Sequence, residues 1–445
     1  MPLVTDPLLR VRYAPGRTLA PWLSSFDAYQ GGECPTPDVE PRPTRALRPR
    51  RTLGAFVDGR THARLAMAAA CLGVELRPLV APATDDSAAD DPAGDAQAAA
   101  CATAAPCDVV TATAEHVPAR ALAALEPVTV ARPAPALLAV AQDRVQEKAW
   151  LDARAGHAAP WHLADSPFAL ADAVRALCAD VGLRASVGAR HPGAWCVVKP
   201  RHRRAGGPLP VLIAAPTEAA AAWDEMGRLP CVVERALAID TELTVLVART
   251  ARGHTAVYPV AQTVREGTRR RWSVLPAPVP TPVARKAQAI GSFYANRLGA
   301  EGLLAVELFV LADGRMVVNE LVPCPHPALD PAELACETDQ FAQLVRAVCG
   351  LPLGGTALVT GAAASVPLPA ATRPAATAAA LADLIPGARL TWYDEAGAVA
   401  TGTDPDAGHV TATGRTPDDA VERALAAAQW VHAAARHAVR RVAQP

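Results

Sequence analysis

The segment 306–320 constrains the fold of this chain more than any other stretch of its sequence. Two apolar runs there flank the pair Asp313-Gly314. An Asp-Gly pair between apolar runs is the strongest short-range signal for a β-hairpin closed by a two-residue turn. With such a turn Ala312 pairs with Arg315, and the sequence predicts two long antiparallel strands.

Counting outward from this turn places Glu307 opposite Glu320. Side chains of directly opposed residues lie roughly 5 Å apart on one face of a sheet, and like charges there are destabilising. A cation between the two carboxylates removes the repulsion, and hard oxygen ligands of this kind suit Mg²⁺. Without a cation, we expect that loss of either carboxylate leaves the fold intact or slightly stabilised. The alternative is a pair of solvated glutamates on an exposed face of the hairpin.

The length and composition of the chain limit its class. A chain of 445 residues is too long for one compact core and predicts two to four domains. A net charge of −1 gives no reason to expect nucleic acid or a membrane surface as a partner. The ten cysteines show no metal-binding spacing, and no apolar run reaches membrane-spanning length. We therefore expect a cytoplasmic protein whose thiols stay reduced.

Changes of pattern along the chain predict four segments. Residues 1–51 are rich in proline and arginine near their end and lack periodicity, which is typical of a disordered extension. Residues 52–143 open with a strand–helix–strand pattern that favours an α/β domain. Residues 144–358 mix hairpins with helices, as an α+β domain does. Residues 359–445 form a small module of short strands and an alanine-rich helix.

Local patterns place individual elements within these segments. Helical spacing predicts helices over 61–72, 284–298 and 333–348. A run typical of a strand covers 255–264, and a hairpin is expected around the loop 200–210. Lys199 ends the first strand of that hairpin, where an ammonium group can reach a bound phosphate.

Short motifs follow one another in a characteristic order over roughly residues 52–435. They are Cys107-Asp108-Val109-Val110-Thr111, Gln142-Asp143-Arg144 with Glu147-Lys148, Val197-Val198-Lys199, Val233-Glu234, Glu242-Leu243-Thr244, Tyr258-Pro259-Val260, Asn319-Glu320 through His326, and Arg346 through Gly354. The ordered set resembles the N5-carboxyaminoimidazole ribonucleotide synthetases, a family of the ATP-grasp superfamily. The resemblance implies an ATP-grasp fold, with an N-terminal Rossmann-like domain and a small C-terminal β-rich module.

The resemblance also implies roles for residues that would contact the phosphates of ATP. Lys199 and Arg144 match the family's catalytic, nucleotide-binding cations. Glu307 and Glu320 match its Mg²⁺ ligands, and Asn319 beside them matches a nucleotide-binding residue.

Further matches concern adenine and ribose. The hinge from Glu234 to Leu237 would read adenine mainly through backbone groups. Glu242 would accept hydrogen bonds from the ribose hydroxyls. Lys148, one helical turn after Arg144, is interpreted as structural.

The substrate half departs from the family pattern, although Glu115 and His326 remain as candidate substrate residues. The loop after Lys199 lacks the family's tyrosine, aspartate and lysine, and Pro208 stiffens it. We expect the arginines at 201–204 in this loop to be solvated. The departures lie at 57–62, 111–115, 204–209, 323–330, 393–395 and 405–409.

The resemblance implies a ligase that forms carboxyphosphate from ATP and bicarbonate and then carboxylates 5-aminoimidazole ribonucleotide in purine biosynthesis. It also implies a homodimer. Because Glu395, Pro405 and Asp406 stand where the family places cationic or phosphate-facing residues, we expect the ribonucleotide to bind weakly and turn over slowly. Two alternatives stay open: an ATP-grasp ligase with another acceptor, and a non-catalytic nucleotide-binding regulatory protein.

Overall fold

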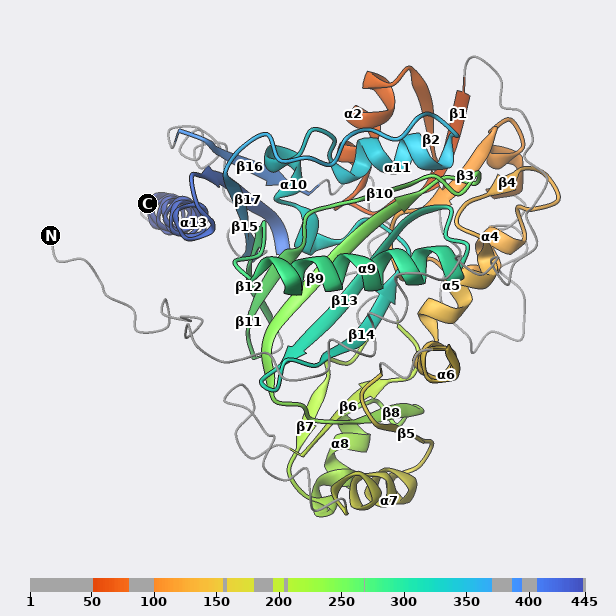
Figure 1. The fold of residues 1–445 in the computed structure, drawn as a ribbon, viewed down its shortest axis with the longest axis vertical. Coiled ribbons are helices and arrows are strands. Elements are labelled where there is room, and N and C mark those ends of the chain that lie inside the picture. The colour runs from red at the N-terminus through yellow and green to blue at the C-terminus, as the bar shows by residue number, and fades with distance from the viewer. Residues whose placement is uncertain are drawn as a thin grey trace, which may run out of the picture.

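The computed structural model describes residues 51–79, 100–154, 158–179, 195–203, 207–267, 269–369, 386–393 and 406–442. The extension predicted over 1–51 lies outside these residues, apart from Arg51, which begins the first strand. Among the described residues the strands form three sheets (Figure 1). No helix in this part of the chain is long and apolar enough to cross a membrane.

A parallel sheet forms the N-terminal part of the molecule (Figure 1). Its strand order is β2-β1-β3-β4, and α2 makes the crossover that parallel strands require. Gly73 has a φ of +67° and follows the end of α2, as predicted. The elements are β1 (Arg51–Phe56), α2 (His62–Cys71), β2 (Val74–Leu79), β3 (Val109–Ala112), α4 (Ala119–Ala123), β4 (Val130–Ala131) and α5 (Pro135–Gln142).

A four-stranded antiparallel sheet forms a small lobe, which is the lowest part of Figure 1. The strand order is β5-β8-β6-β7, and α7 and α8 cover one face through a shared apolar core. The predicted hairpin around 200–210 is confirmed as β6 paired with β7. The elements of the lobe, with the helix α6 that leads into it, are α6 (Arg144–Arg154), β5 (Trp161–Ala164), α7 (Pro167–Cys178), β6 (Cys196–Pro200), β7 (Val211–Ile213), a 3-10 helix (Pro216–Glu218), α8 (Ala219–Glu225) and β8 (Cys231–Arg235).

A large antiparallel sheet forms the centre of the molecule, with strand order β14-β13-β9-β11-β12-β15-β17-β16 and β10 beside β9. The helix α9 crosses its front face in Figure 1. The elements are β9 (Ile239–Arg249), β10 (Thr255–Val257), β11 (Ala261–Glu266), β12 (Arg269–Leu275), α9 (Thr281–Arg297), β13 (Gly302–Leu311), β14 (Met316–Val322), a 3-10 helix (Pro327–Leu329), α10 (Ala332–Ala335) and α11 (Gln340–Val348).

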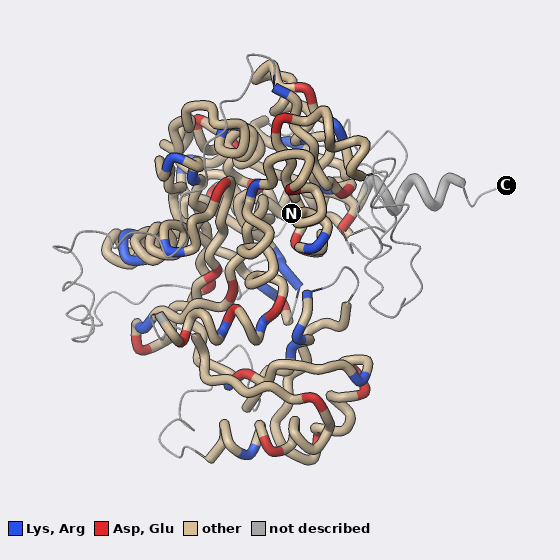
Figure 2. The backbone as a smooth tube through the Cα atoms, turned by 90° about the vertical axis from the view of Figure 1, so that its right-hand side faces the viewer, with Lys and Arg blue, Asp and Glu red and all other residues tan. Residues whose placement is uncertain are grey.

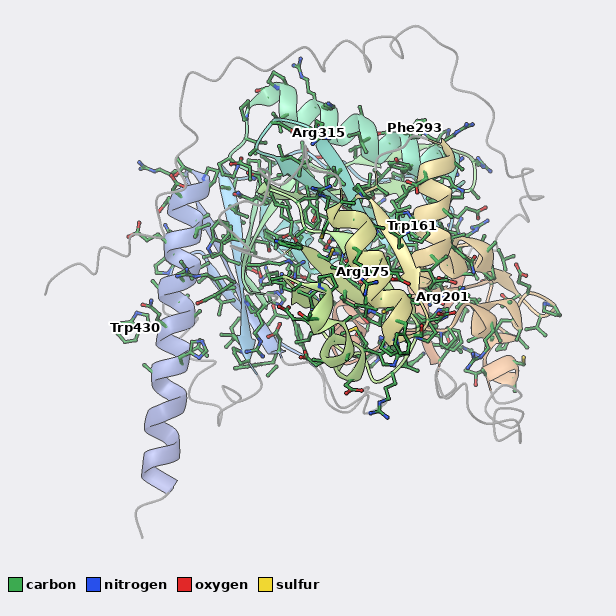
Figure 3. All side chains as sticks on the ribbon, turned by 90° about the horizontal axis from the view of Figure 1, so that it is seen from below. Trp161, Arg175, Arg201, Phe293, Arg315 and Trp430 are labelled. Atoms are coloured by element: carbon green, nitrogen blue, oxygen red, sulfur yellow. The ribbon has the colours of Figure 1, made fainter. Side chains whose placement is uncertain are left out.

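The C-terminal strands continue the large sheet because β15 pairs with β12. The elements of this part are β15 (Ala362–Pro369), β16 (Ala388–Trp392), β17 (Asp406–Gly414) and α13 (Pro417–Val442). Small apolar residues let α13 lie close to β15 and β17. Trp430 projects from α13 away from the sheets and is 60% exposed (Figure 3).

Alternation along β9 decides which face of the large sheet is available for polar residues. Leu243, Val245 and Val247 pack under α9 in one apolar core. The helix approaches so closely that a Cβ atom at Gly291 would lie 2.7 Å from Val245. Since neighbouring strand residues point to opposite faces, Glu242 lies on the face away from α9. Acidic and basic segments are interspersed over both the small lobe and the rest of the molecule (Figure 2).

Two predicted elements are interrupted in the structure. The predicted helix 333–348 is two helices, α10 and α11, because Cys336 adopts an extended conformation. Asp339 then caps α11 by accepting two backbone N–H hydrogen bonds. The predicted strand 255–264 is divided into β10 and β11, and Pro259, which has no N–H to donate, lies between them.

The turn of the hairpin β13–β14 differs from the predicted two-residue turn. The N–H of Leu311 donates to the carbonyl of Arg315 over 2.8 Å, so Ala312 does not pair with Arg315. The loop has three residues, and the last of them, Gly314, has a φ of +83°. Near the turn the strands are therefore one residue out of the predicted register.

A β-bulge at Asn319 restores the predicted register further along the hairpin. Leu308 pairs with Val318, whereas Glu307 pairs with Glu320, so Asn319 is the extra residue. Bulges of this kind re-aim side chains. The predicted opposition of Glu307 and Glu320 is confirmed, and the extra residue directly precedes Glu320 on β14.

Candidate active site

A cluster of charged side chains around Lys199 joins the small lobe to the large sheet. Lys199 Nζ lies 3.0 Å from Glu234 Oε2 on β8 and 2.9 Å from Asn319 Oδ1 on β14. Lys148 Nζ lies 3.0 Å from the other carboxylate oxygen of Glu234. One carboxylate therefore holds two buried ammonium groups, and one of these reaches across to the hairpin.

The charges in this cluster are stabilised by one another. Burial raises the pKa of Glu234, but Lys148 and Lys199 outweigh that effect and hold it at about 2. Burial lowers the pKa of Lys199, and Glu234 opposes the change. A glutamate that stays ionised keeps both lysines available as cations, which is what the phosphates of a nucleotide require.

The bulge in β14 sets the geometry of the two hairpin glutamates. Asn319 Nδ2 donates to Glu307 Oε2 over 2.8 Å, while its carbonyl oxygen accepts from Lys199. Glu307 Oε1 lies 3.0 Å from His326 Nε2 and 3.7 Å from Arg265 Nη2. Burial alone would raise the pKa of Glu307, but the hydrogen bond and charge of His326, with Arg265, lower it.

Glu320 belongs to a second group of charges, which Arg203 connects. Arg203 Nη2 lies 2.7 Å from Glu320 Oε2 and 3.0 Å from Glu147 Oε2. Arg144 Nη2 is 3.8 Å from Glu320 Oε2, and Arg144 Nη1 donates to the carbonyl of Pro200 over 2.8 Å. The two hairpin carboxylates are therefore neutralised separately by side chains of this protein.

The two hairpin carboxylates are the residues that could hold a divalent metal. Glu307 and Glu320 offer hard carboxylate oxygens from paired positions, and Glu307 is held ionised. Their donor type fits Mg²⁺. Side chains of the protein already contact both carboxylates, so a bound metal would replace Arg203 and His326 or share the oxygens with them.

Glu242 lies on the same face of the large sheet, two strands from β14. It is buried and accepts from Arg265 Nε over 2.8 Å. Arg265 thus links Glu242 to Glu307. The carboxylate predicted to bind ribose is brought close to the carboxylates predicted to bind metal.

The predicted adenine hinge follows β8. The backbone N–H groups of Arg235 and Ala236 donate to other loops of the lobe, and the carbonyl of Leu237 accepts from Ile239 over 2.9 Å. The side chain of Glu234 holds the two lysines instead of lying free in the hinge.

A cavity of about 260 Å³ opens beside this charged cluster. Its lining comes from the loops after β1 and β3, from Arg203, and from the segment after β14. Glu115, a predicted substrate residue, lines it, and burial raises the pKa of Glu115 against the effect of Arg203. Two further lining residues are Asp58 and Arg60.

His326, the other predicted substrate residue, faces Glu307, one of the carboxylates predicted to bind metal. Its Nδ1 accepts from the backbone N–H of Ala328 over 3.2 Å, so Nε2 carries the proton that points to Glu307. The structure therefore places His326 in support of Glu307 and not among the residues that line the cavity.

The prediction of solvated arginines after Lys199 is wrong for Arg203. Its side chain is only 6% exposed, because four polar groups from three elements surround it. Arg201, by contrast, is 33% exposed and pairs with Asp143. Residues 204–206 lie outside the described part of the chain.

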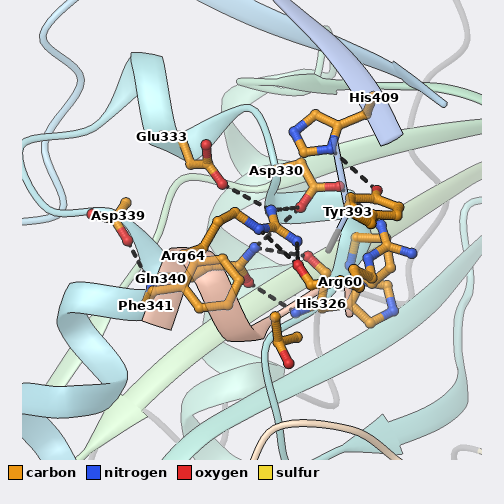
Figure 4. A network of polar contacts seen from close by, with 12 residues as sticks. Arg60, Arg64, His326, Asp330, Glu333, Asp339, Gln340, Phe341, Tyr393 and His409 are labelled. Carbon is orange, nitrogen blue, oxygen red and sulfur yellow. Dashed lines mark hydrogen bonds and ion pairs between the residues drawn. The ribbon is translucent and has the colours of Figure 1, made fainter. Parts of the chain in front are cut away.

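Next to Arg60, a second buried network joins the N-terminal part, the large sheet and the C-terminal strands (Figure 4). Asp330 accepts from Arg60 over 3.1 Å and from Arg64 over 2.8 Å, and Arg270 lies 3.6 Å away. The guanidinium of Arg60 also stacks on the ring of Tyr393 at 5.0 Å. Of the tail positions that depart from the family's cationic or phosphate-facing residues, 394, 395 and 405 lie outside the described residues.

Sequence reasoning missed Lys148, Arg203 and Arg265 as members of the site. Lys148 had a usable signal, since its spacing of four residues from Arg144 places both on one helix face. Arg203 had none, because loop residues show no periodicity. Arg265 sits beyond a bulge in β11, where counting along the strand fails.

Comparison with known proteins agrees with this geometry. Residues 174–341 match the ATP-grasp domain family. The chain is 32% identical over 323 residues to the N5-carboxyaminoimidazole ribonucleotide synthase of Brucella melitensis, which covers 70% of this chain and 84% of the relative. Identity to the synthase of Synechococcus elongatus is 32% over 320 residues, or 70% of this chain and 77% of the relative.

Solved structures show the same architecture. The ADP complex of an N5-carboxyaminoimidazole ribonucleotide synthetase matches with a TM-score of 0.73 and 26% identity, over 88% of this chain and 99% of that one. The Aspergillus clavatus enzyme, solved with ADP and 5-aminoimidazole ribonucleotide, shares the fold with a TM-score of 0.71 and 22% identity. The match covers 86% of this chain and 98% of that one.

Fold and site together define an ATP-grasp ligase. The chain belongs to the N5-carboxyaminoimidazole ribonucleotide synthase family, as its relatives over most of its length demonstrate. The predicted fold class and the predicted family are thus confirmed.

Proposed function

We propose that this protein uses ATP, with Mg²⁺, to carboxylate 5-aminoimidazole ribonucleotide with bicarbonate. The observation that carries the proposal is the contact of Lys199 with both Glu234 and Asn319. It brings the cations of the small lobe to the carboxylates of the large sheet, beside a cavity for an acceptor.

Lys199, Lys148 and Arg144 are the cations that would face the phosphates of ATP. Lys199 and Arg144 are the two we assign to catalysis, since both lie within 4 Å of the hairpin residues. Glu234 keeps the lysines in place, and Asn319 fixes Lys199 from the other sheet. Positioning and charge stabilisation account for most of the catalysis in phosphoryl transfer.

Glu307 and Glu320 would hold Mg²⁺. The metal would neutralise charge on the transferred phosphoryl group when bound. Glu242 would accept the ribose hydroxyls, and the backbone of the hinge from Glu234 to Leu237 would read adenine. These are the roles proposed for the predicted site residues.

The chemistry takes place in two displacements. An oxygen of bicarbonate attacks the γ-phosphorus of ATP, the bond to the β–γ bridging oxygen breaks, and ADP leaves. The amine of the ribonucleotide then attacks the carboxyl carbon of carboxyphosphate. The bond from that carbon to the phosphate oxygen breaks, phosphate leaves with the electron pair, and the amine loses a proton. Glu115 lines the acceptor cavity, where a carboxylate can orient this amine.

The ribonucleotide is favoured over another acceptor because the cation Arg60 lines the cavity. The expectation of weak binding rested on Glu395, Pro405 and Asp406, which stand where the family places cationic or phosphate-facing residues. Arg60, from the N-terminal part of the chain, supplies a cation that those tail positions lack.

The test is phosphate release from ATP and bicarbonate, measured with and without the ribonucleotide. We expect ribonucleotide-dependent release that Lys199→Met abolishes and that Lys286→Met, on α9 away from the site, leaves unchanged. In parallel, ADP with Mg²⁺ at 100 times its Kd should stabilise the protein by about 2.7 kcal/mol. Nucleotide binding without ribonucleotide-dependent release would favour another acceptor, and no nucleotide binding would refute the proposal.

We also infer a cytoplasmic homodimer with domains at 52–143, 144–358 and 359–445. The inference rests on the family resemblance and on the change of pattern along the sequence. Light scattering of the purified full chain tests the dimer, and a monomer at micromolar concentration would refute it.

A further inference from the structure

One side chain, Arg203, belongs both to the predicted metal site and to the acceptor cavity. Its Nη2 atom contacts Glu320 at 2.7 Å, and its Nη1 atom lies 4.0 Å from Glu115 Oε2. The same residue lines the cavity. Arg203 is therefore a side chain that the predicted metal site and the cavity share.

Arg203 is held in this place without Glu320. Its backbone N–H donates to the carbonyl of Gln142 over 3.1 Å, and Nη1 donates to the carbonyl of Leu321 over 3.1 Å. The fully buried carboxylate of Glu147 accepts from Nη2 at 3.0 Å. When a divalent cation occupies Glu320, the contacts with Leu321 and Glu147 still hold the guanidinium.

The guanidinium also has hydrogen-bonding capacity to spare. Its Nε–H group is buried and has no hydrogen-bond partner among the described residues. If a metal bound to Glu320, the Nη2 group of Arg203 that now contacts Glu320 would be able to donate to a ligand instead. A buried donor without a partner costs free energy, so a ligand oxygen placed there is favoured.

We propose that Arg203 binds the carboxylate group that is transferred, first in bicarbonate and then in carboxyphosphate. A guanidinium fork matches a carboxylate in charge and in geometry. The position between Glu320 and Glu115 is where the reaction proposed above must hold that group. This inference rests on the proposed function and names the residue for one of its substrates.

The test separates bicarbonate from the other substrates. In Arg203→Met we expect the KM for bicarbonate to rise about ten- to hundredfold, the effect of losing a charge-assisted hydrogen bond. The KM values for ATP and for the ribonucleotide should change by less than about threefold. The matched control is Arg201→Met, two residues earlier on the same loop and outside the cavity lining, with an unchanged KM for bicarbonate.

A binding measurement gives a readout besides turnover. Phosphonoacetate, a stable mimic of carboxyphosphate, should raise the melting temperature of the wild-type protein in the presence of ADP and Mg²⁺. The shift should be lost in Arg203→Met and kept in Arg201→Met. ADP with Mg²⁺ alone should still stabilise both variants.

Two further variants guard against a folding defect. Arg203→Met leaves buried Glu147 without its cation, so Glu147→Gln with Arg203→Met removes both charges together. Arg203→Lys keeps the charge without the fork and should show a smaller rise in KM. An unchanged bicarbonate KM and phosphonoacetate shift in these folded variants would overturn the inference.

Other outcomes are equally decisive. A rise confined to the ribonucleotide KM would assign Arg203 to the acceptor and overturn the inference while leaving the proposed function intact. Absence of any bicarbonate-dependent phosphate release in the wild type would refute the proposed function itself.

Discussion

The carboxylates of Glu307 and Glu320 and the carboxylate of Asp330 all lie beside arginines, yet the two groups differ in how they are held. Glu320 is 20% exposed and lies beside Arg203, which lines the cavity, whereas Glu307 is 3% exposed. Asp330 is 1% exposed and accepts from Arg60 and Arg64, which come from a different part of the chain.

The buried network around Asp330 also contains a set of residues with the spacing of a metal site. Oxygen and nitrogen atoms of Asp330, Glu333 and His409 lie within 4.8 Å of one another. Arg64 already pairs with Asp330 and Glu333 at 2.8 Å each (Figure 4). Burial, opposed by Asp330, lowers the pKa of His409 to about 3, so this imidazole adds no charge at neutral pH. Geometry alone therefore does not make a metal site, because the cations present decide whether a carboxylate is available.

The largest expected effect concerns the Asp330 network. Asp330→Asn should destabilise the fold by about 3–5 kcal/mol, because Arg60, Arg64 and Arg270 would remain close together without their common acceptor. Urea unfolding measures the loss. Glu75→Gln, which breaks an exposed pair with Arg77, should cost less than about 1 kcal/mol. Equal losses in the two variants would contradict a structural role for the network.

A pH dependence is expected for the lysine-binding carboxylate of the site. The pKa of Glu234 in the folded protein is about 2, below the value of about 4.3 for an unfolded glutamate. Its stabilisation is therefore fully present above pH 4.3 and is lost as the pH falls toward 2, an effect of about 3 kcal/mol. Unfolding of wild type and of Glu234→Gln should differ at pH 6 and converge near pH 2. A constant difference would argue against this ion pair.

Substitutions of the two hairpin glutamates should differ in their effect on the stability of the nucleotide-free protein. Glu320→Gln should weaken the binding of ADP with Mg²⁺ about ten- to hundredfold, with little change in the nucleotide-free fold, because Arg203 keeps Glu147. Glu307→Gln should also destabilise the nucleotide-free protein, since Glu307 is buried and holds His326 and Asn319. Calorimetric titration and urea unfolding measure the two effects. If Glu307→Gln and Glu320→Gln had similar free energies of unfolding, the structural role expected for Glu307 would be wrong.

The smallest expected effect concerns Arg60, which lines the cavity and also belongs to the Asp330 network. Arg60→Leu should raise the KM for the ribonucleotide about tenfold, since Arg60 lines the cavity while Asp330 and Tyr393 hold it. Affinity for ADP with Mg²⁺ should stay the same, because Arg60 lies on the acceptor side. Steady-state kinetics and calorimetry give both values. A loss of nucleotide affinity would mean that the two halves of the site are not independent.

The stability expected for the glutamate variants differs from what the hairpin pattern alone predicts. From the sequence, two opposed carboxylates repel, so that removal of one relieves strain. In the structure Arg203 and Arg144 lie beside Glu320, while His326 lies beside Glu307. Arg265 lies 3.7 Å from Glu307 as well. The arginines come from segments distant from the hairpin in the sequence, which conceals them, and the partners of Glu307 reverse the expected sign for its substitution.

Some predictions succeeded because they depend on short-range pattern. The hairpin β6–β7, the end of α2 at Gly73 and the opposition of Glu307 to Glu320 all follow from local spacing and turn residues. The last of these succeeded although its turn was misjudged, because the bulge at Asn319 compensated for the longer loop. Two local irregularities of one residue each cancel, and no residue count predicts them.

By itself, the sequence determined the class of fold and the family, because periodicity, turn chemistry and ordered motifs are local properties of a chain. Only the tertiary structure decided which charges neutralise one another. Lys148 with Glu234, Arg203 with Glu320 and Arg64 with Asp330 are contacts between separate segments. The strength of such a contact depends on burial and distance, and both exist only once the three sheets have come together.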